Sequence, residues 1–134
     1  MLRSILAFMT VLAACTAAAA QGLPASSTWK NERGSELTVT TVDATGKFSG
    51  TYVNRAAGFG CQDEPFDVSG HAWSRRVVFS VVWKNANQDC RSITTWAGFV
   101  RKAALSTTWQ LARVDPKTGR IKVRWGRARF EPVK

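Results

Sequence analysis

The sequence is poor in the residues that usually carry out catalysis or hold metals. It contains one histidine, His71, and three cysteines among its 134 residues. Cys15 belongs to an N-terminal apolar segment, which leaves Cys61, Cys90 and His71, too few for a four-ligand zinc site without distant carboxylates. A single histidine with no free thiol to activate also argues against nucleophilic catalysis. The composition therefore predicts neither an enzyme nor a metalloprotein.

Long apolar runs are absent beyond the N-terminus. The segment from Ser4 to Ala14 is shorter than the about 20 apolar residues that a membrane-spanning helix needs, so no transmembrane segment is expected. It follows a basic start at Arg3 and precedes alanines at 18–20, the pattern of a signal peptide with its cleavage site. We expect a secreted or periplasmic protein. Its expected divisions are a signal peptide over residues 1–20, a short linker over 21–27 and one domain over 28–134.

The three cysteines fit this compartment. Leu12-Ala13-Ala14-Cys15 resembles a bacterial lipoprotein box, and in that alternative Cys15 becomes an acylated, lipid-anchored N-terminus. Either form of processing removes Cys15 from the redox count. Cys61 and Cys90 then remain as an even pair in an oxidising compartment, and a single disulfide is expected.

Acidic residues are outnumbered by basic ones. Nineteen Lys and Arg against nine Asp and Glu give a net charge of +10, or +9 once Arg3 leaves with the signal peptide. Such an excess attracts nucleic acid and anionic surfaces. The basic residues are spread, however, and alternate with apolar positions in the expected strands, as on a solvated outer face. Binding of an acidic macromolecule through this face stays open as an alternative function.

No stretch from Thr28 onward keeps a helical period, whereas short strand-like segments alternate with turn residues. The turns around Asp43 to Gly46 and Asp115 to Gly119 carry residues that tolerate tight-turn dihedral angles. Eight consecutive strands predict an all-β, antiparallel up-and-down barrel. The expected strands are Thr28–Glu32, Ser35–Val42, Gly46–Arg55, Phe66–Trp73, Arg76–Lys84, Ser92–Arg101, Ala104–Val114 and Arg120–Glu131.

Alternate residues of a strand face opposite sides, so one set must point into the barrel. The set expected inside is Ser35, Leu37, Val39, Phe48, Gly50, Tyr52, Asn54, Phe79, Val81, Trp83, Ser92, Thr94, Trp96, Thr107, Trp109 and Leu111. The set expected outside includes Lys47, Ser80, Lys84, Arg91, Thr95, Arg127 and Arg129. No carboxylate pair falls inside, which again speaks against catalysis. Inward aromatics also speak against specific nucleic-acid binding, which uses aromatics on an outer basic face.

The expected interior has an apolar floor, and its Trp, Tyr, Asn, Ser and Thr residues gather toward one end. Buried hydroxyl and amide groups cost about 1–3 kcal/mol each unless a partner satisfies them. A polar ligand entering from that end would supply such partners, and an eight-stranded barrel is wide enough for one small ligand. A core of mutually bonded polar groups, with Trp as filler, is the alternative that the pattern leaves open.

Several motifs then resemble the avidin family, over nearly the whole chain from Thr28 to Lys134. The chain carries an opening Trp-x-Asn-x-x-Gly-Ser at 29–35 and a Gly-x-Tyr at 50–52. Trp-Lys-Asn at 83–85, Ser-x-Thr-x-Trp-x-Gly at 92–98 and Thr-x-Trp-x-Leu at 107–111 complete the pattern. Details at 52–56, 60–62 and 89–90 resemble the short dimeric bacterial members, which implies a homodimer and a Cys61–Cys90 bridge beside the pocket.

The resemblance implies high-affinity, non-covalent biotin binding. Asn31, Ser35 and Tyr52 match the family's donors to the ureido oxygen, and Asn54 matches an acceptor for one ureido N–H. Thr94 matches the hydroxyl that faces the thioether sulfur. The remaining matches are an apolar box of Trp83, Trp96, Trp109 and Leu111, and a carboxylate subsite of Ser92 with the backbone of residues 56–58, including Ala57 and Gly58.

The chain departs from the family pattern in its last strand. Ala128 stands where the family has an Asp that accepts the second ureido N–H, which is expected to weaken binding or to favour a biotin analogue without that donor. Arg120 stands where tetrameric relatives place a Trp that enters a neighbour's pocket, which favours a dimer. Trp125 is then expected between subunits or half-buried outside the barrel, and Trp73 is expected to serve packing.

Overall fold

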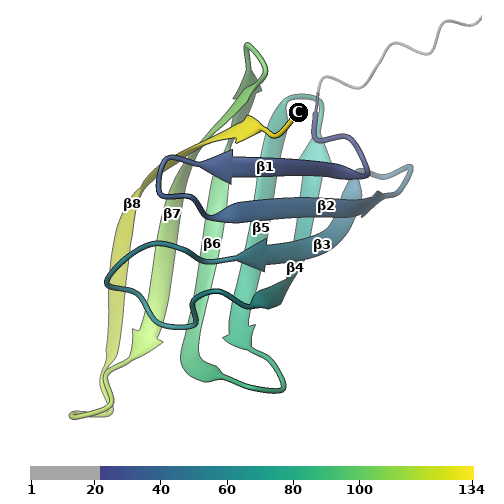
Figure 1. Ribbon diagram of the computed structural model, residues 1–134. Helices are drawn as coiled ribbons and strands as arrows, with labels where there is room; N and C mark the ends of the chain where they lie inside the picture. The colour runs from purple at the N-terminus through teal and green to yellow at the C-terminus, as the bar shows by residue number, and fades with distance from the viewer. Residues whose placement is uncertain (1–21) are drawn as a thin grey trace, which may run out of the picture.

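The computed structural model describes residues 22–134, which form a closed barrel of eight antiparallel strands (Figure 1). Each strand pairs with the next in sequence, and β8 closes the barrel by pairing with β1. The strands are β1 (Ser27–Asn31), β2 (Glu36–Val42), β3 (Lys47–Val53), β4 (Pro65–Trp73), β5 (Arg76–Lys84), β6 (Asp89–Arg101), β7 (Ala104–Val114) and β8 (Ile121–Pro132). The predicted architecture is confirmed, and the largest shift in a strand start is at β6. The expected signal peptide and Cys15 lie outside the described residues.

Two hairpins show why the chain reverses where the sequence predicts. In the β2–β3 turn the Asp43 carboxylate accepts hydrogen bonds from the backbone N–H groups of Thr45 and Lys47. Gly46 follows with a φ of 86°, a left-handed conformation that glycine adopts without steric cost. In the β7–β8 turn Asp115 accepts from the backbone N–H of Lys117 in the same way. Both turns are therefore set by local aspartate chemistry.

The core fills one end of the barrel, which we call the closed end. Side chains below 2% exposure there come from strands all around the barrel. The largest are Phe48, Phe66, Phe79, Phe130, Leu37 and Leu105. Leu23, from the segment expected to be a linker, is also buried in this core. The other end of the barrel is left for polar side chains and the tryptophans.

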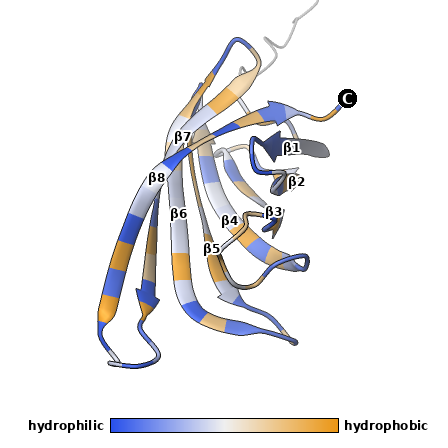
Figure 2. Ribbon diagram, turned by 60° about the vertical axis from the view of Figure 1, so that its left-hand side comes forward, coloured by the Kyte–Doolittle hydropathy of each residue, from blue (hydrophilic) through white to orange (hydrophobic). Residues whose placement is uncertain are grey.

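Most inward and outward residues follow the predicted alternation. Arg91 and Arg127, which were expected outside, line the cavity instead, and Arg91 has a left-handed φ of 50° near the start of β6. Figure 2 shows bands of opposite hydropathy along β8, where Ile121 and Val123 face outward.

One expectation for tryptophan was wrong, since Trp73 is 66% exposed and does not pack in the core. Trp125 is 75% exposed, so it is not half-buried in the single chain, and its expected place between subunits stays a prediction. Phe99 is exposed as well, so the aromatics do not all point inward. The physical reason is parity, because each of the three occupies an outward position of its strand.

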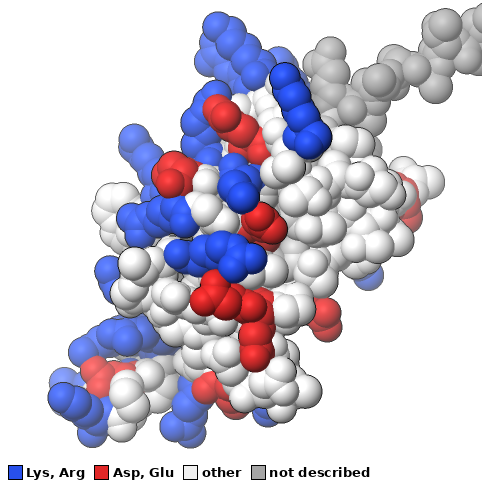
Figure 3. All heavy atoms as spheres, viewed as in Figure 1, with Lys and Arg blue, Asp and Glu red and all other residues white. Residues whose placement is uncertain are grey.

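Charged residues are dispersed over the outside of the barrel. Figure 3 shows Lys and Arg interspersed with Asp and Glu on the visible face. Five ion pairs join basic and acidic side chains in the described chain, including Lys30 with Glu36 at 3.0 Å. No helix among residues 22–134 is long and apolar enough to cross a membrane.

Candidate ligand-binding site

A cavity of about 370 Å³ opens at the end of the barrel opposite the closed end. The loops β1–β2, β3–β4, β5–β6 and β7–β8 lie at this open end (Figure 1). Residues of the β1–β2, β3–β4 and β7–β8 loops line the cavity, together with the adjoining ends of β5 and β6. Its volume lies in the range of about 300–1,000 Å³ that is usual for small-molecule sites. Its wall has two halves of different chemistry, one polar and one apolar.

The polar half comes from the ends of β1 and β3 and from the loops that follow them. The Asn31 side-chain oxygen accepts the backbone N–H of Ser35 at 3.0 Å, and its amide nitrogen donates to the Tyr52 hydroxyl at 3.4 Å. Ser35 Oγ accepts the backbone N–H of Arg55 at 2.9 Å and lies 3.5 Å from Asn54 Oδ1. These bonds fix Asn31, Ser35, Tyr52 and Asn54 as one connected group.

Tyr52 is a buried member of this group. Burial raises the pKa of its hydroxyl above the ordinary value of 10.0, hydrogen bonds with Ser35 and Asn31 oppose the rise, and the charge of Glu32 adds to it. The hydroxyl therefore keeps its proton throughout the physiological range. Its role toward a ligand is that of a hydrogen-bond donor.

The apolar half comes from the inward faces of β5, β6 and β7. Trp96 stacks on Phe79 with ring centroids 4.8 Å apart, and Trp83 donates its indole N–H to Thr94 Oγ1 at 2.7 Å. Trp109 lies against β8 at Gly126, where a Cβ would come within 2.4 Å of the indole ring. Only glycine lets Trp109 lie flat there. Together with Leu111, the three tryptophans form a wall suited to a ring with two apolar faces.

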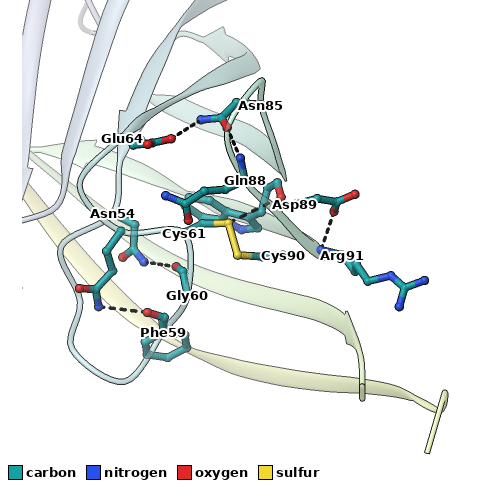
Figure 4. Close-up of a disulfide and its surroundings, with 12 residues drawn as sticks. Asn54, Phe59, Gly60, Cys61, Glu64, Asn85, Gln88, Asp89, Cys90 and Arg91 are labelled. Carbon is teal, nitrogen blue, oxygen red and sulfur yellow. Dashed lines mark hydrogen bonds between the residues drawn. A yellow bond between two sulfur atoms is a disulfide. The ribbon is translucent and has the colours of Figure 1, made fainter. Parts of the chain in front are cut away.

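The β3–β4 loop, residues 54–64, closes over one side of the cavity. Asn54 donates to the carbonyl of Gly60 at 3.0 Å (Figure 4). Gln62 donates to the carbonyls of Ala56 and Phe59. A disulfide joins Cys61 of this loop to Cys90 of β6, as expected. Phe59 places its ring edge against Trp109, with centroids 6.1 Å apart. The loop is therefore tied to both halves of the wall.

The structure brings together all but one of the predicted site residues. Those that line the cavity are Asn31, Ser35, Tyr52, Asn54, Gly58, Trp83, Ser92, Thr94, Trp96, Trp109 and Leu111. Ala57 is the exception, since it is exposed while its neighbours Ala56 and Gly58 line the wall. His71 lies far from the cavity lining and bonds to the carbonyl oxygen of Thr45. Within residues 22–134 no cluster of His, Cys, Asp or Glu has the arrangement of a metal site.

Comparisons with known proteins agree with this geometry. The model of the avidin family matches residues 19–131. The chain belongs to the avidin family. It is 41% identical to afifavidin of Afifella pfennigii over 109 residues, which cover 78% of this chain and 68% of afifavidin. It is 37% identical to hoefavidin of Hoeflea phototrophica over 110 residues, which cover 74% and 67% of the two chains.

A solved structure of the avidin family shows how far the likeness extends in space. The rhizavidin–biotin complex superposes with a TM-score of 0.77 at 36% identity, covering 83% of this chain and 93% of rhizavidin. The barrel is therefore shared with a relative that has been seen holding biotin.

Several residues that line the avidin-type cavity were not predicted as site residues, and Glu32, Phe59, Arg113 and Arg124 are among them. The alternation rule could have found Arg113 and Arg124. Arg113 continues the inward series Trp109 and Leu111 along β7, and Arg124 is the β8 partner of Leu111. Glu32 and Phe59 lie on loops, where no alternation applies, so only the folded chain shows their position.

Ala128 faces the interior as the pattern predicts. It is buried at the cavity wall, where its methyl group offers no hydrogen-bond acceptor. Its carbonyl oxygen is already used, because Thr107 donates to it at 2.9 Å. The backbone N–H of the next residue, Arg129, donates to Glu32 Oε2 at 2.9 Å.

Proposed function

We propose that the protein binds biotin non-covalently and with high affinity in this cavity, and that it catalyses no reaction. Two findings support the proposal. The rhizavidin relative of the same fold has been solved with biotin. The cavity of this chain also presents hydrogen-bond donors that converge at its floor, as the ureido oxygen of biotin requires.

The main support for the proposal is that three side chains of the polar half keep a free hydrogen-bond donor. Asn31 spends one amide hydrogen on Tyr52, so its second hydrogen is available. The Tyr52 hydroxyl accepts from Asn31 and keeps its own proton to donate. Ser35 Oγ accepts from the backbone of Arg55, which leaves its hydroxyl proton to turn toward a ligand. Three neutral donors at one urea oxygen polarise the urea and strengthen one another.

The remaining groups suit the rest of biotin. When Ser35 turns to the urea oxygen it releases Asn54 Oδ1, which lies at 3.5 Å and can then accept one ureido N–H. Thr94 Oγ1 accepts from Trp83, so its own proton points to the thioether sulfur. Trp83, Trp96 and Trp109 each offer about 150–250 Å² of surface to bury against the bicyclic ring.

The Ala128 side chain gives the second ureido N–H no acceptor of its own. If no other group accepted this N–H, its loss would cost about 1.5–3 kcal/mol, or roughly 10- to 150-fold in affinity. An analogue without the N–H would then be disfavoured less than biotin. Competition between biotin and such an analogue measures whether the cavity accepts this N–H.

Calorimetric titration of the mature protein with biotin tests the proposal. We expect one biotin per chain. Tyr52→Phe removes one donor and leaves Asn31 without its acceptor, which costs about 1–3 kcal/mol and weakens binding by about 5- to 150-fold. Trp73→Phe, at an exposed site away from the cavity, is the control and should bind as the natural protein does. No heat and no thermal shift with excess biotin would overturn the proposal.

We also propose that the protein forms a homodimer through the outer face of β5–β8. Register places Val82 beside Ile93, Ile93 beside Ala112, and Ala112 beside Val123, so an apolar row crosses four strands. All four side chains are exposed, and Trp125 lies on the same face of β8. Contiguous apolar patches of this kind mark interaction sites.

Light scattering with size exclusion measures the assembly. The natural protein should elute with twice the mass of one chain, and Val123→Glu should elute as a monomer that still binds biotin. Ser106→Glu, on the outer face of β7 away from the row, should stay dimeric. A monomeric natural protein would contradict the proposed interface.

Export to the periplasm or the medium is proposed as well. The Cys61–Cys90 bridge supports it, since disulfides persist in oxidising compartments. The intact mass of the mature protein separates the two routes. Cleavage after residue 20 gives an unmodified chain that begins at Gln21, whereas an acylated Cys15 adds the mass of its lipid.

A further inference from the structure

The cavity carries an excess of positive charge at its open end. Its lining includes five arginines and two carboxylates, and within residues 22–134 none of the five arginines forms a salt bridge. The arginines are Arg33, Arg91, Arg113, Arg124 and Arg127. Of the two carboxylates, Asp89 is already paired with Lys84 at 3.8 Å. A ligand whose outer end is anionic would meet attraction there.

Three basic residues, Arg113, Lys122 and Arg124, lie close together on β7 and β8. Along the inward faces, Ser92 of β6 pairs with Arg113 of β7, which pairs with Lys122 of β8. Arg124 lies one inward position deeper on β8 than Lys122. Lys122 is neutralised by Asp115, and the Arg124 guanidinium lies over the Phe59 ring at 4.9 Å. Arg113 is the one of the three without such a partner in the described chain.

Arg113 carries a buried hydrogen-bond donor that is not satisfied. Its Nε is buried and has no hydrogen-bond partner, the single buried side-chain nitrogen or oxygen in residues 22–134 of which this is true. A buried donor without a partner is costly, and a guanidinium recovers that cost best by binding a carboxylate or phosphate. The position therefore points to an anionic group of the ligand.

The depth of Arg113 fits the carboxylate of biotin. Thr94 and Leu111 form the inward pair just below Ser92 and Arg113. Inward residues of one strand are about 6.8 Å apart along it, comparable with the length of the valeryl chain that leads from the ring to the carboxylate. With the thioether at Thr94, the carboxylate reaches the pair of Ser92 and Arg113.

We propose that Arg113 is the counter-ion of the ligand's carboxylate and makes the cavity selective for free biotin over biotin amides and esters. The inference rests on the proposed biotin function. The protein would then capture free biotin in preference to biotin attached to a protein lysine, because the attached form is an amide without the carboxylate charge.

Competition between biotin and biotinamide tests the selectivity. The two ligands share the ring system and differ in the charge at the end of the chain. The natural protein should prefer biotin by about tenfold or more, the factor expected for one charge-assisted hydrogen bond. Arg113→Gln should lower the affinity for biotin to that for biotinamide and leave biotinamide binding unchanged. Salt should reduce the preference in the natural protein only.

Arg76→Gln removes the same charge at an outward position of β5 and should keep the preference. Equal affinities for biotin and biotinamide in the natural protein would overturn the inference. So would an Arg113→Gln variant that loses both ligands equally, because Arg113 would then act on the fold. If the natural protein binds neither ligand, it is the biotin function itself that fails.

Glu32 lies in the β1–β2 loop, and its side chain reaches the backbone of β8. The Glu32 Oε2 accepts the backbone N–H of Arg129 at 2.9 Å, which holds the carboxylate beside Ala128. Glu32 lines the cavity, and its negative charge helps to raise the pKa of the Tyr52 hydroxyl. Only Oε2 accepts a hydrogen bond from the described chain, so Oε1 is available to a ligand.

We infer that Glu32 provides the acceptor for the ureido N–H that faces Ala128. A cyclic urea has two N–H groups, and the polar half of the wall has one acceptor for them, Asn54. Glu32 is the carboxylate held next to the other. The inference also rests on biotin binding.

A double-mutant cycle at positions 32 and 128 tests this inference. Glu32→Gln keeps an oxygen for Arg129 and should weaken biotin binding by about tenfold, through loss of a charged acceptor. Ala128→Asp should restore that loss in the Glu32→Gln chain. In the natural chain it should give no gain, because two carboxylates would then crowd one N–H. Equal gains in both chains, or an unaffected Glu32→Gln, would overturn the inference. A natural chain that binds no biotin would defeat the function instead.

Discussion

The two halves of the cavity wall are built on different physical principles. In the polar half, Asn31, Ser35, Tyr52 and Asn54 are linked through hydrogen bonds to one another and to loop backbone. In the apolar half, three tryptophans are held by packing, with one indole N–H bonded to Thr94. The polar half thus sets the orientation of a bound ligand, and the apolar half supplies the surface that buries it. A ligand needs both a polar ring edge and apolar ring faces.

The largest expected effect comes from removing part of the apolar half. Trp96→Ala deletes a buried ring that stacks on Phe79 at 4.8 Å. We expect the free energy of unfolding to fall by about 3–5 kcal/mol, since a large cavity remains in the core. Biotin binding should weaken strongly as well. Chemical denaturation and calorimetry measure the two effects.

Trp73→Ala is the matched control, because Trp73 is exposed on the outside of β4. Its unfolding free energy and biotin affinity should stay close to those of the natural chain. A Trp96→Ala chain as stable as this control would show that packing does not hold the apolar half in place.

The polar half depends on the loop that the disulfide ties down. Replacing both Cys61 and Cys90 by Ser removes a bridge across 29 positions of sequence. The unfolding free energy should fall by about 3–4 kcal/mol, because the unfolded chain regains conformational freedom. Biotin should also dissociate faster, since the loop that carries Asn54 and Gly60 is less ordered. Denaturation curves and dissociation rates check these results, and unchanged values for both would contradict the role of the bridge.

The smallest expected effect lies at the rim, where the β7–β8 turn supports the apolar half. The Lys122 ammonium, together with the backbone N–H groups of Lys117 and Thr118, lowers the pKa of Asp115 from 3.8 to about 2. A carboxyl with a lowered pKa stabilises the fold above its ordinary pKa. That contribution should be lost as the pH falls from about 4 through about 2.

Comparing unfolding of the natural chain and Asp115→Asn across this pH window isolates the effect. The difference in stability between them should shrink as the pH falls. A difference that stays constant down to pH 2 would show that the charge of Asp115 does not stabilise the turn.

The contrast between the halves also explains what the sequence alone predicts. Strand residues such as Tyr52, Trp96 and Leu111 obey alternation, so their inward positions follow from the order of residues. Trp73 was expected to serve packing, yet it occupies an outward position of β4 and is exposed. Strand parity therefore decides its burial.

Loop residues escaped prediction for a different reason. Glu32 and Phe59 reach the cavity through turns of irregular backbone, and their positions depend on contacts with Arg129 and Trp109 that are remote in sequence. Ala57 illustrates the same limit, because it was expected in the carboxylate subsite while the loop turns Ala56 and Gly58 toward the cavity instead. Arg113 follows the alternation of β7, yet it was not predicted, because a charged residue near the end of a strand usually faces solvent.

A crystal structure of the protein with biotin would show the direction in which the ligand binds. We expect the ureido oxygen about 2.7–3.2 Å from Asn31 Nδ2, Ser35 Oγ and Tyr52 Oη at once, with the ring between Trp83, Trp96 and Trp109. Biotin bound in the reverse direction, or bound with its urea away from these three donors, would contradict this expectation.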